Sequence, residues 1–196
     1  MGQIVKITLA TSNPHKVEEI NLIARDFDVE FVLPEGHFDP VENGSTFLEN
    51  AACKVLEAVK SGNTELYLAD DSGLCVEALN GAPGIYSARY EQTPEKRIDK
   101  LLKNLEGIKD RSAEFVCAMV VANKKGEILY QTQGKCTGSI MQERKGINGF
   151  GYDPVFFVNK YQKGMAELSP HEKALVSHRS VALNNVLNWL KNGCIK

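Results

Sequence analysis

In the stretch Leu66-Tyr67-Leu68-Ala69-Asp70-Asp71-Ser72-Gly73, two adjacent carboxylates follow an apolar run that predicts a β-strand. Neighbouring side chains on an extended chain point to opposite sides, so at most one of the two carboxylates shares a side with Ser72. Two aspartates at a strand end repel each other, and a bound cation would offset that repulsion. Asp-Asp-Ser-Gly is equally typical of a polar turn, and this segment alone favours neither interpretation.

Upstream of this stretch, the chain predicts a strand and then a helix that begins beside an anion-binding loop. Ile4 to Ala10 has the composition of a strand, and Thr11-Ser12-Asn13-Pro14-His15-Lys16 interrupts it. Asn13 suits the N-cap of a helix and Pro14 its first position. Backbone amides and the helix dipole favour an anion there, and Lys16 adds a mobile positive charge. The loop is not a Walker A sequence, and taken alone Lys16 is better explained as a solvated lysine.

One acidic residue in the following loop, Glu42, is a candidate metal ligand. Val29 to Leu33 predicts a second strand and Pro34 to Gly44 a loop. Thr46-Phe47-Leu48-Glu49 has the pattern of a capping box for a helix that runs to about Lys60, which explains Glu49 without a metal. A loop carboxylate is usually just solvated, but the position of Glu42 allows it to approach a cleft shared with Asp71.

The remaining elements predict a mixed sheet. Asn123-Lys124-Lys125-Gly126 is a hairpin signal between two long strand candidates. Because other strands are linked by helices, we expect an α/β fold with a mixed sheet flanked by helices. Strands are predicted over 75–79, 113–122, 128–137 and 155–158, and a helix capped by Thr93 over 94–105. A helical pattern extends from Ser169 to Lys191, where Ser177-His178-Arg179 interrupts the apolar positions and Ser177 could cap a second helix.

The stretch Gly146-Ile147-Asn148-Gly149-Phe150-Gly151-Tyr152-Asp153 combines three glycines with two aromatic residues and has no periodicity. It predicts a loop that approaches a ligand closely. A purine offers flat faces on which an aromatic ring can stack. Aromatic residues that anchor a loop to the core are an equally common explanation.

Composition excludes several classes of function. A net charge of −2 over 196 residues provides no basic field for duplex nucleic acid. Five cysteines without a C-x-x-C pair argue against a disulfide scaffold or a structural zinc site, and favour a reducing compartment. Met1-Gly2-Gln3-Ile4 lacks the features of a signal peptide, and no apolar run is long enough to span a bilayer. We therefore expect a soluble, cytoplasmic protein that binds neither nucleic acid nor membrane.

Six short motifs, in this order along the chain, closely resemble the inosine/xanthosine triphosphate pyrophosphatases, which remove deaminated purine nucleotides. Each motif is weak alone, but the ordered set is specific and extends from about Ile7 to Leu190. The motifs are Thr11-Ser12-Asn13-x-x-Lys16, Thr46-Phe47-x-Glu49-Asn50-Ala51, Ala69-Asp70-Asp71-Ser72-Gly73-Leu74, Gly84-Ile85-Tyr86-Ser87-Ala88-Arg89-Tyr90, Phe150-Gly151-Tyr152-Asp153-Pro154 and Ser177-His178-Arg179.

The resemblance implies a long mixed sheet in a single domain over residues 1–196, with two lobes around a central cleft, and a homodimer. It implies Mg²⁺-dependent hydrolysis of a purine nucleoside triphosphate between the α- and β-phosphorus, which yields the monophosphate and pyrophosphate. Asp71 matches the general base and, with Glu42, a metal ligand. The loop Val41-Glu42-Asn43-Gly44 departs from the paired acids often found there. Substrate contacts are implied for Thr11, Ser12, Asn13, Pro14, His15, Lys16, Ser72, Phe150, Gly151, Tyr152, Asp153, Lys173, His178 and Arg179.

The chemistry of the bases adds a hypothesis about selectivity. Hypoxanthine and xanthine carry an acceptor oxygen at position 6, whereas adenine carries an amino donor. A guanidinium such as that of Arg179 would donate to the 6-oxygen of hypoxanthine or xanthine. Opposite adenine, the same guanidinium would face the amino group, so that two donors would meet without an acceptor. Two alternatives remain open: a pyrimidine or modified-nucleotide pyrophosphatase of related fold, and a nucleotide-binding module without turnover.

Overall fold

The computed structural model describes residues 4–62 and 64–194, and over these residues seven strands form one sheet in the order β2-β1-β3-β4-β5-β6-β7. β1 pairs in parallel with β2 and β3, whereas β6 pairs antiparallel with β5 and β7, so the predicted α/β fold with a mixed sheet is confirmed. Met1–Gln3, on which the prediction of no signal peptide largely depends, lie outside the described residues.

By its contacts the chain divides into two compact units. Unit 1 comprises residues 1–71, 117–134 and 179–196, and unit 2 comprises residues 72–116 and 135–178. Three long strands contribute residues to both units: β3 (Leu66–Val76), β4 (Ser112–Asn123) and β5 (Ile128–Ile140). The single domain with two lobes around a cleft, as the resemblance implies, stays a prediction.

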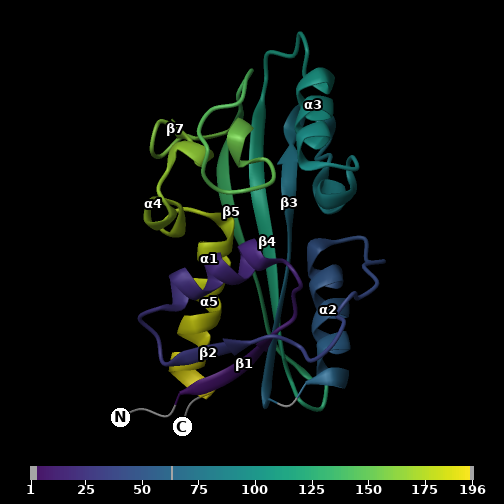
Figure 1. Ribbon diagram of the computed structural model, residues 1–196, viewed down its shortest axis with the longest axis vertical. Coiled ribbons are helices and arrows are strands. Elements are labelled where there is room, and N and C mark those ends of the chain that lie inside the picture. The colour runs from purple at the N-terminus through teal and green to yellow at the C-terminus, as the bar shows by residue number, and fades with distance from the viewer. Residues whose placement is uncertain (1–3, 63, 195–196) are drawn as a thin grey trace. The chain divides into compact units, whose positions relative to one another are not determined.

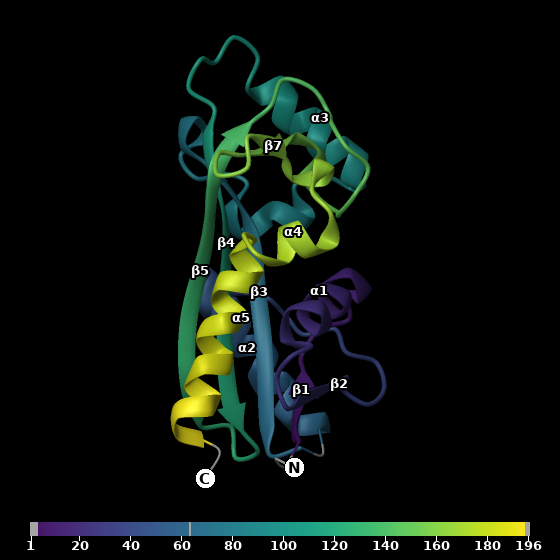
Figure 2. The same ribbon diagram turned by 90° about the vertical axis from the view of Figure 1, so that its left-hand side faces the viewer.

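In unit 1, helices cover both faces of the sheet (Figure 1). The unit contains β1 (Val5–Leu9), α1 (Pro14–Ala24), β2 (Val29–Val32) and α2 (Phe47–Ser61), with most of α5 (His178–Trp189) and a π-helical turn over Leu190–Cys194. One face packs α1 and α5 against Ile7, Leu68 and Met119, and the other packs Ala51, Val55 and Ala58 of α2 against Tyr67, Ala69 and Val120. Figure 2 shows α5 lying along the long strands.

Unit 2 has its own hydrophobic core around Leu74, Leu101, Phe115, Phe156 and Leu168. Its regular elements are α3 (Pro94–Asn104), β6 (Phe156–Val158), β7 (Lys163–Gly164) and α4 (Pro170–Ala174). 3₁₀ turns over Glu77–Leu79, Gly84–Arg89, Asp153–Val155 and Met165–Glu167 connect them. The predicted strand over 75–79 is wrong, since its first two residues end β3 and the rest form a 3₁₀ turn.

β3 differs from the prediction in a way that matters for the site. It runs without interruption from Leu66 to Val76, so Asp70 and Asp71 lie in the middle of a strand, neither at its end nor in a turn. Both aspartates are buried, with exposed fractions of 1% and 7%. Buried carboxylates are tolerated in a strand only when cations or hydrogen-bond donors meet them. The interior of unit 1 supplies such partners.

The predicted helix starts at Asn13, Thr46, Thr93 and Ser169 are confirmed, but the pattern predicted from Ser169 to Lys191 forms two helices, α4 ending at Ala174 and α5 beginning at His178. Asn13, Thr46, Thr93 and Ser169 cap α1, α2, α3 and α4, each accepting a hydrogen bond from a backbone amide of the first turn. At α2 the Glu49 carboxylate accepts from the amide and hydroxyl of Ser45, at 2.6 and 2.7 Å, so Glu49 is used in local structure as expected. Among the described residues no helix is long and apolar enough to cross a membrane.

Replacement of Thr46 tests how much this cap contributes. Thr46→Ala removes the acceptor 3.1 Å from the Glu49 amide, so we expect the free energy of unfolding to fall by about 1 kcal/mol. Thr46→Ser keeps the hydroxyl and should stay close to wild type. Urea unfolding followed by circular dichroism measures both, and equal losses in the two variants would contradict this account.

Candidate functional site

Asp70 and Asp71 point to opposite faces of β3 and meet different partners. Asp70 lies on the side of α1 and α5, where Lys16 Nζ is 3.0 Å from Oδ1 and 2.9 Å from Oδ2. Asp71 lies on the side of α2, where Lys54 Nζ is 2.8 Å from its Oδ1 and Asn50 Nδ2 is 3.3 Å from its Oδ2. The alternation predicted from the sequence therefore separates two polar clusters.

The cluster around Asp70 pairs two buried side chains, Asp70 and Arg179, with two half-buried ones, Lys16 and Glu19. Arg179, 1% exposed, donates from Nη2 to Asp70 Oδ2 at 3.2 Å and from Nη1 to Glu19. Burial alone would raise the pKa of Asp70, but the charges of Lys16 and Arg179 hold it far below its ordinary value. The same carboxylates raise the pKa of Arg179 against the effect of burial. Asp70 therefore carries a negative charge that fixes two cations.

Asp71 and Glu42 converge on one cation. Lys54 Nζ is 2.8 Å from Asp71 Oδ1 and 2.9 Å from Glu42 Oε1, so both carboxylates point to the same place. Burial raises the pKa of Asp71. The positive charge of Lys54 lowers it in part, and the negative charge of Glu42 raises it further, so that the pKa lies above its ordinary value. Burial alone would lower the pKa of Lys54, but Asp71, Asp70 and Glu42 raise it overall, so the ammonium is charged.

These two carboxylates fit a magnesium ion. Mg²⁺ prefers oxygen ligands and binds through one or two carboxylates together with substrate phosphates. No group of three His, Cys, Asp or Glu side chains that could hold a metal occurs in the part of the chain that the structure describes. Glu42 and Asp71 are suited to an ion shared with phosphates, since the lysine between them already shows that the place attracts a cation.

The loop Thr11–Lys16 leads into α1 as predicted, but several of its polar groups already form hydrogen bonds or an ion pair within the chain. His15 N–H donates to Asn13 Oδ1 at 3.0 Å and Lys16 N–H to Asn13 O at 3.2 Å. Thr11 is buried and accepts from the Asn13 amide, whereas Ser12, Pro14 and His15 are exposed. The expectation of a mobile Lys16 is wrong, because Asp70 fixes its ammonium.

Unit 2 brings together three of the residues predicted to bind a substrate. Lys173 Nζ lies 2.6 Å from Asp153 Oδ2 and 4.8 Å from the centre of the Phe150 ring. Asp153 Oδ2 also accepts from the Phe150 amide at 2.8 Å. Gly149 has φ +75°, and a Cβ there would collide with the Asp153 carboxylate, so the approach of this loop requires glycine. The result is an aromatic ring held beside a buried ion pair.

The other predicted residues have varied surroundings. Tyr152 is buried and donates from its hydroxyl to Ser87 O at 3.1 Å, next to the half-buried Gly151. His178, also buried, stacks on Phe115 with ring centres 4.8 Å apart, and Ser72 is half-buried on β3. That Arg179 reads a base stays a prediction, and in the structure its guanidinium bonds Asp70 and Glu19.

Sequence reasoning missed Lys54, Asn50 and the role of Asp70. Asn50 and Lys54 lie one helical turn apart on α2, and both are buried. A signal was present, because Lys54 falls within the apolar stripe formed by Ala51, Val55 and Ala58. A lysine on the inner face of a helix requires an anionic partner, and the acidic stretch of β3 offers one.

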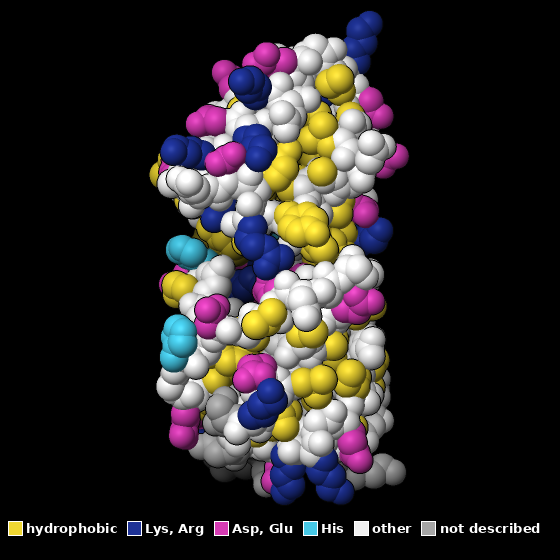
Figure 3. All heavy atoms as spheres, turned by 90° about the vertical axis from the view of Figure 1, so that its right-hand side faces the viewer, with side chains coloured by type: hydrophobic (Ala, Val, Ile, Leu, Met, Phe, Trp, Pro, Cys, Tyr) yellow, Lys and Arg dark blue, Asp and Glu magenta, His cyan; other side chains and the backbone are white. Residues whose placement is uncertain are grey.

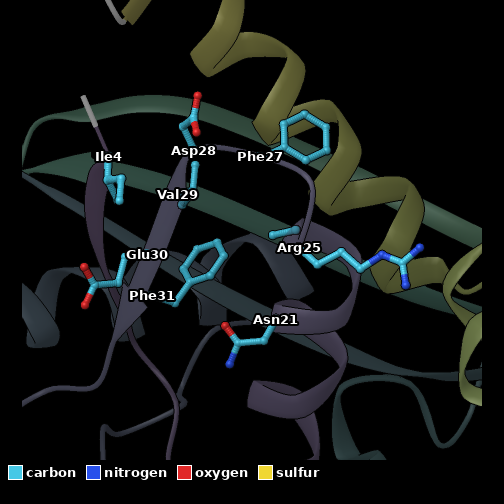
Figure 4. A pocket seen from close by; sticks show the side chains of 9 residues that line it. Ile4, Asn21, Arg25, Phe27, Asp28, Val29, Glu30 and Phe31 are labelled. Atoms are coloured by element: carbon cyan, nitrogen blue, oxygen red, sulfur yellow. The ribbon is translucent and has the colours of Figure 1, made fainter. Parts of the chain in front are cut away.

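A hollow of about 420 Å³ lies elsewhere in unit 1, between the end of α1 and β2 (Figure 4). Ile4, Asn21, Ala24, Arg25, Phe27, Asp28, Val29, Glu30 and Phe31 line it, none of them a predicted site residue. Figure 3 shows lysine and arginine side chains interspersed with carboxylates on one face of the molecule, without a continuous basic field. This distribution agrees with the low net charge.

Comparison with known proteins gives one consistent result. The model of the Ham1 family matches residues 7–189. A protein of Synechocystis sp. named dITP/XTP pyrophosphatase is 42% identical over 182 residues, which cover 93% of both chains. Two solved structures are similar. A HAM1 protein from Coxiella burnetii has a TM-score of 0.84 and 40% identity, and the match covers 96% of this chain and 100% of that one. The Staphylococcus aureus Ham1 protein has a TM-score of 0.83 and 41% identity, and the match covers 95% of this chain and 98% of that one.

The Asp70 cluster leads to a prediction about stability. Asp70→Asn leaves the buried Arg179 and the half-buried Lys16 without their shared counter-charge, so we expect a loss of about 3–5 kcal/mol at pH 7. In wild type the unfolded carboxyl takes up its proton near pH 3.8 and the folded one only at lower pH, so this contribution declines as the pH falls below about 4. The difference between variant and wild type should therefore be about 1 kcal/mol smaller at pH 3 than at pH 7.

Urea unfolding at both pH values measures this difference. Asp99→Asn is the matched control, because Asp99 also pairs with an arginine, Arg144 at 2.7 Å, but is exposed. It should change stability by no more than about 0.5 kcal/mol. An Asp70→Asn variant as stable as this control would overturn the assignment.

Proposed function

The chain belongs to the Ham1 family, and from this membership and the site geometry we propose that it hydrolyses the deaminated purine nucleotides ITP, dITP and XTP. The products are the nucleoside monophosphate and pyrophosphate. The observation that carries the proposal is the convergence of Asp71 and Glu42 on one cation position, 2.8 and 2.9 Å from Lys54 Nζ. The names of the curated relatives support the choice of substrate.

We propose Mg²⁺ as the cofactor, held by Glu42 and Asp71 together with substrate phosphates. When bound, the ion would neutralise charge on phosphate oxygens, which is the main requirement of phosphoryl transfer. In the chain alone, the ammonium of Lys54 lies between the same two carboxylates and offsets part of their charge. The pair is therefore arranged for a cation before any ligand arrives.

Asp71 is the proposed general base. In the chain without a metal, burial raises its pKa above the ordinary value, which makes the carboxylate a stronger acceptor for a proton of the attacking water. Asn50 and Lys54 fix its two oxygens and so limit its rotation. The Asp71 carboxylate takes the proton from water as the oxygen attacks phosphorus. Lys16, held by Asp70, and the N-terminal end of α1 stabilise the charge of the departing pyrophosphate.

Phe150 is the residue that we propose for stacking on the base. The Lys173–Asp153 pair beside its ring offers a donor and an acceptor. For the phosphates we propose Lys16 and the start of α1, because the ammonium of Lys16 is held there by Asp70. Homodimer formation stays a prediction from the resemblance.

A panel of nucleoside triphosphates tests the proposed reaction. We expect pyrophosphate release from ITP, dITP and XTP with Mg²⁺, little from ATP, GTP, dTTP or UTP, and none after EDTA. Asp71→Asn should lower kcat by about 100-fold or more, because it removes the proton acceptor and one metal ligand. Circular dichroism checks that the variant is folded.

The outcomes separate the alternatives. Asp26→Asn is the control, since Asp26 is an exposed aspartate of the same unit, and it should retain wild-type turnover. Preference for dTTP or UTP would favour a pyrimidine pyrophosphatase. Nucleotide binding without pyrophosphate release would favour a non-catalytic module, and full turnover by Asp71→Asn would remove Asp71 as the base.

Stacking on Phe150 gives a second prediction. Phe150→Leu keeps an apolar side chain but removes the ring, so affinity for ITP should fall by about tenfold, within the range measured for base–aromatic stacking. Inorganic triphosphate has no base, and its affinity should not change. Phe157→Leu, a partly buried phenylalanine of the same unit, is the control. Calorimetry measures both ligands, and equal weakening of both by Phe150→Leu would argue against stacking.

A further inference from the structure

Asn50 joins the two parts of the proposed metal site through the two ends of its side-chain amide. It lies in the first turn of α2 with an exposed fraction of 0%. Its Oδ1 accepts from the backbone amide of Gly44 at 2.8 Å, and its Nδ2 donates to Asp71 Oδ2 at 3.3 Å. Gly44 is two residues from Glu42, so one side-chain amide links the loop that carries Glu42 to the strand that carries Asp71.

We propose that Asn50 is a positioning residue that holds the Glu42 loop and Asp71 together, and thereby sets the affinity of the pair for a divalent cation. The inference rests on the proposed function, because it takes Glu42 and Asp71 as the metal ligands. The loop between β2 and α2 has no regular structure, so its distance from β3 depends on such anchors. The bond from Gly44 N–H to Asn50 is one of them.

The packing at Gly44 supports a specific anchor. A Cβ at Gly44 would lie 2.6 Å from Glu49 Cβ and 2.9 Å from both the backbone nitrogen and Oδ1 of Asn50. These distances are too short for any side chain, so the loop reaches Asn50 only because residue 44 is glycine. The close approach and the hydrogen bond therefore depend on each other.

The two oxygens of Asp71 have different partners, and this division explains why residue 50 is an asparagine. Oδ2 accepts from the neutral amide of Asn50, whereas Oδ1 accepts from Lys54, which also contacts Glu42. A metal ion would compete with the ammonium of Lys54 for the same charges, but not with a neutral amide. Asn50 can therefore keep its contacts whether or not a cation is bound. Only a side chain with both a donor and an acceptor serves the two partners, which excludes aspartate and leucine.

Metal affinity tests the role of Asn50 without relying on turnover. Free Mn²⁺ measured by electron paramagnetic resonance gives the Kd of the ion for the protein alone. Asn50→Leu, of similar size but without polar atoms, should raise this Kd by about 10-fold to 100-fold, as loss of a ligand's hydrogen-bond partner does elsewhere.

Two further variants complete the test. Gly44→Ala breaks the same link from the loop side, so a similar rise in Kd is expected even if Asn50→Leu does not fold. Asn185→Leu removes another asparagine of unit 1, whose Nδ2 bonds Thr132 Oγ1 at 3.0 Å, and should leave the Kd unchanged. If the folded Asn50 and Gly44 variants bind Mn²⁺ with a Kd within twofold of the wild-type value, this inference is overturned while the proposed function stands. A wild-type protein that neither binds Mn²⁺ nor needs a divalent ion for turnover would overturn it together with the proposed cofactor.

Discussion

Two adjacent negative charges in the middle of a buried strand are the constraint on which unit 1 depends. Because side chains alternate along β3, Asp70 and Asp71 must be neutralised from opposite faces of the sheet. Lys16 and Arg179 do so from α1 and α5, and Lys54 from α2. Each helix that covers the sheet therefore brings a cation as well as an apolar face, and the position of each helix is tied to the charge on β3.

The two aspartates show how different surroundings shift the pKa of identical side chains in opposite directions. Both are buried, and burial alone would raise both pKa values. Asp70 is met by enough positive charge to lower its pKa below the ordinary value, so it is locked in the ionised form and suits a structural role. Asp71 keeps a raised pKa because Lys54 only partly offsets burial and Glu42 adds a like charge. A carboxylate that accepts a proton more readily than usual is the one suited to act as a base.

What the sequence could predict depends on how far apart the interacting residues are. Helix caps at Asn13, Thr46, Thr93 and Ser169 join residues at most three positions apart, and all were predictable. The pairs of Asp70 with Lys16 and Arg179 span 54 and 109 positions, and composition contains no trace of them. That absence explains the one serious error. Without knowledge of buried partners, two aspartates appear unsuited to a strand interior, and so β3 was expected to end at Ala69.

The balance of charge differs between the two polar clusters. The Asp70 cluster pairs two carboxylates, those of Asp70 and Glu19, with two cations, Lys16 and Arg179. The Asp71 cluster places two carboxylates, those of Asp71 and Glu42, against Lys54 alone, so it carries one uncompensated negative charge when all three side chains are ionised. That charge would repel the tail of a triphosphate. A single 2+ ion reverses the sign and makes the same side chains attractive to phosphates. A monovalent ion would only cancel the charge, so this balance of charges supports the divalent cofactor that we propose for the Asp71 cluster.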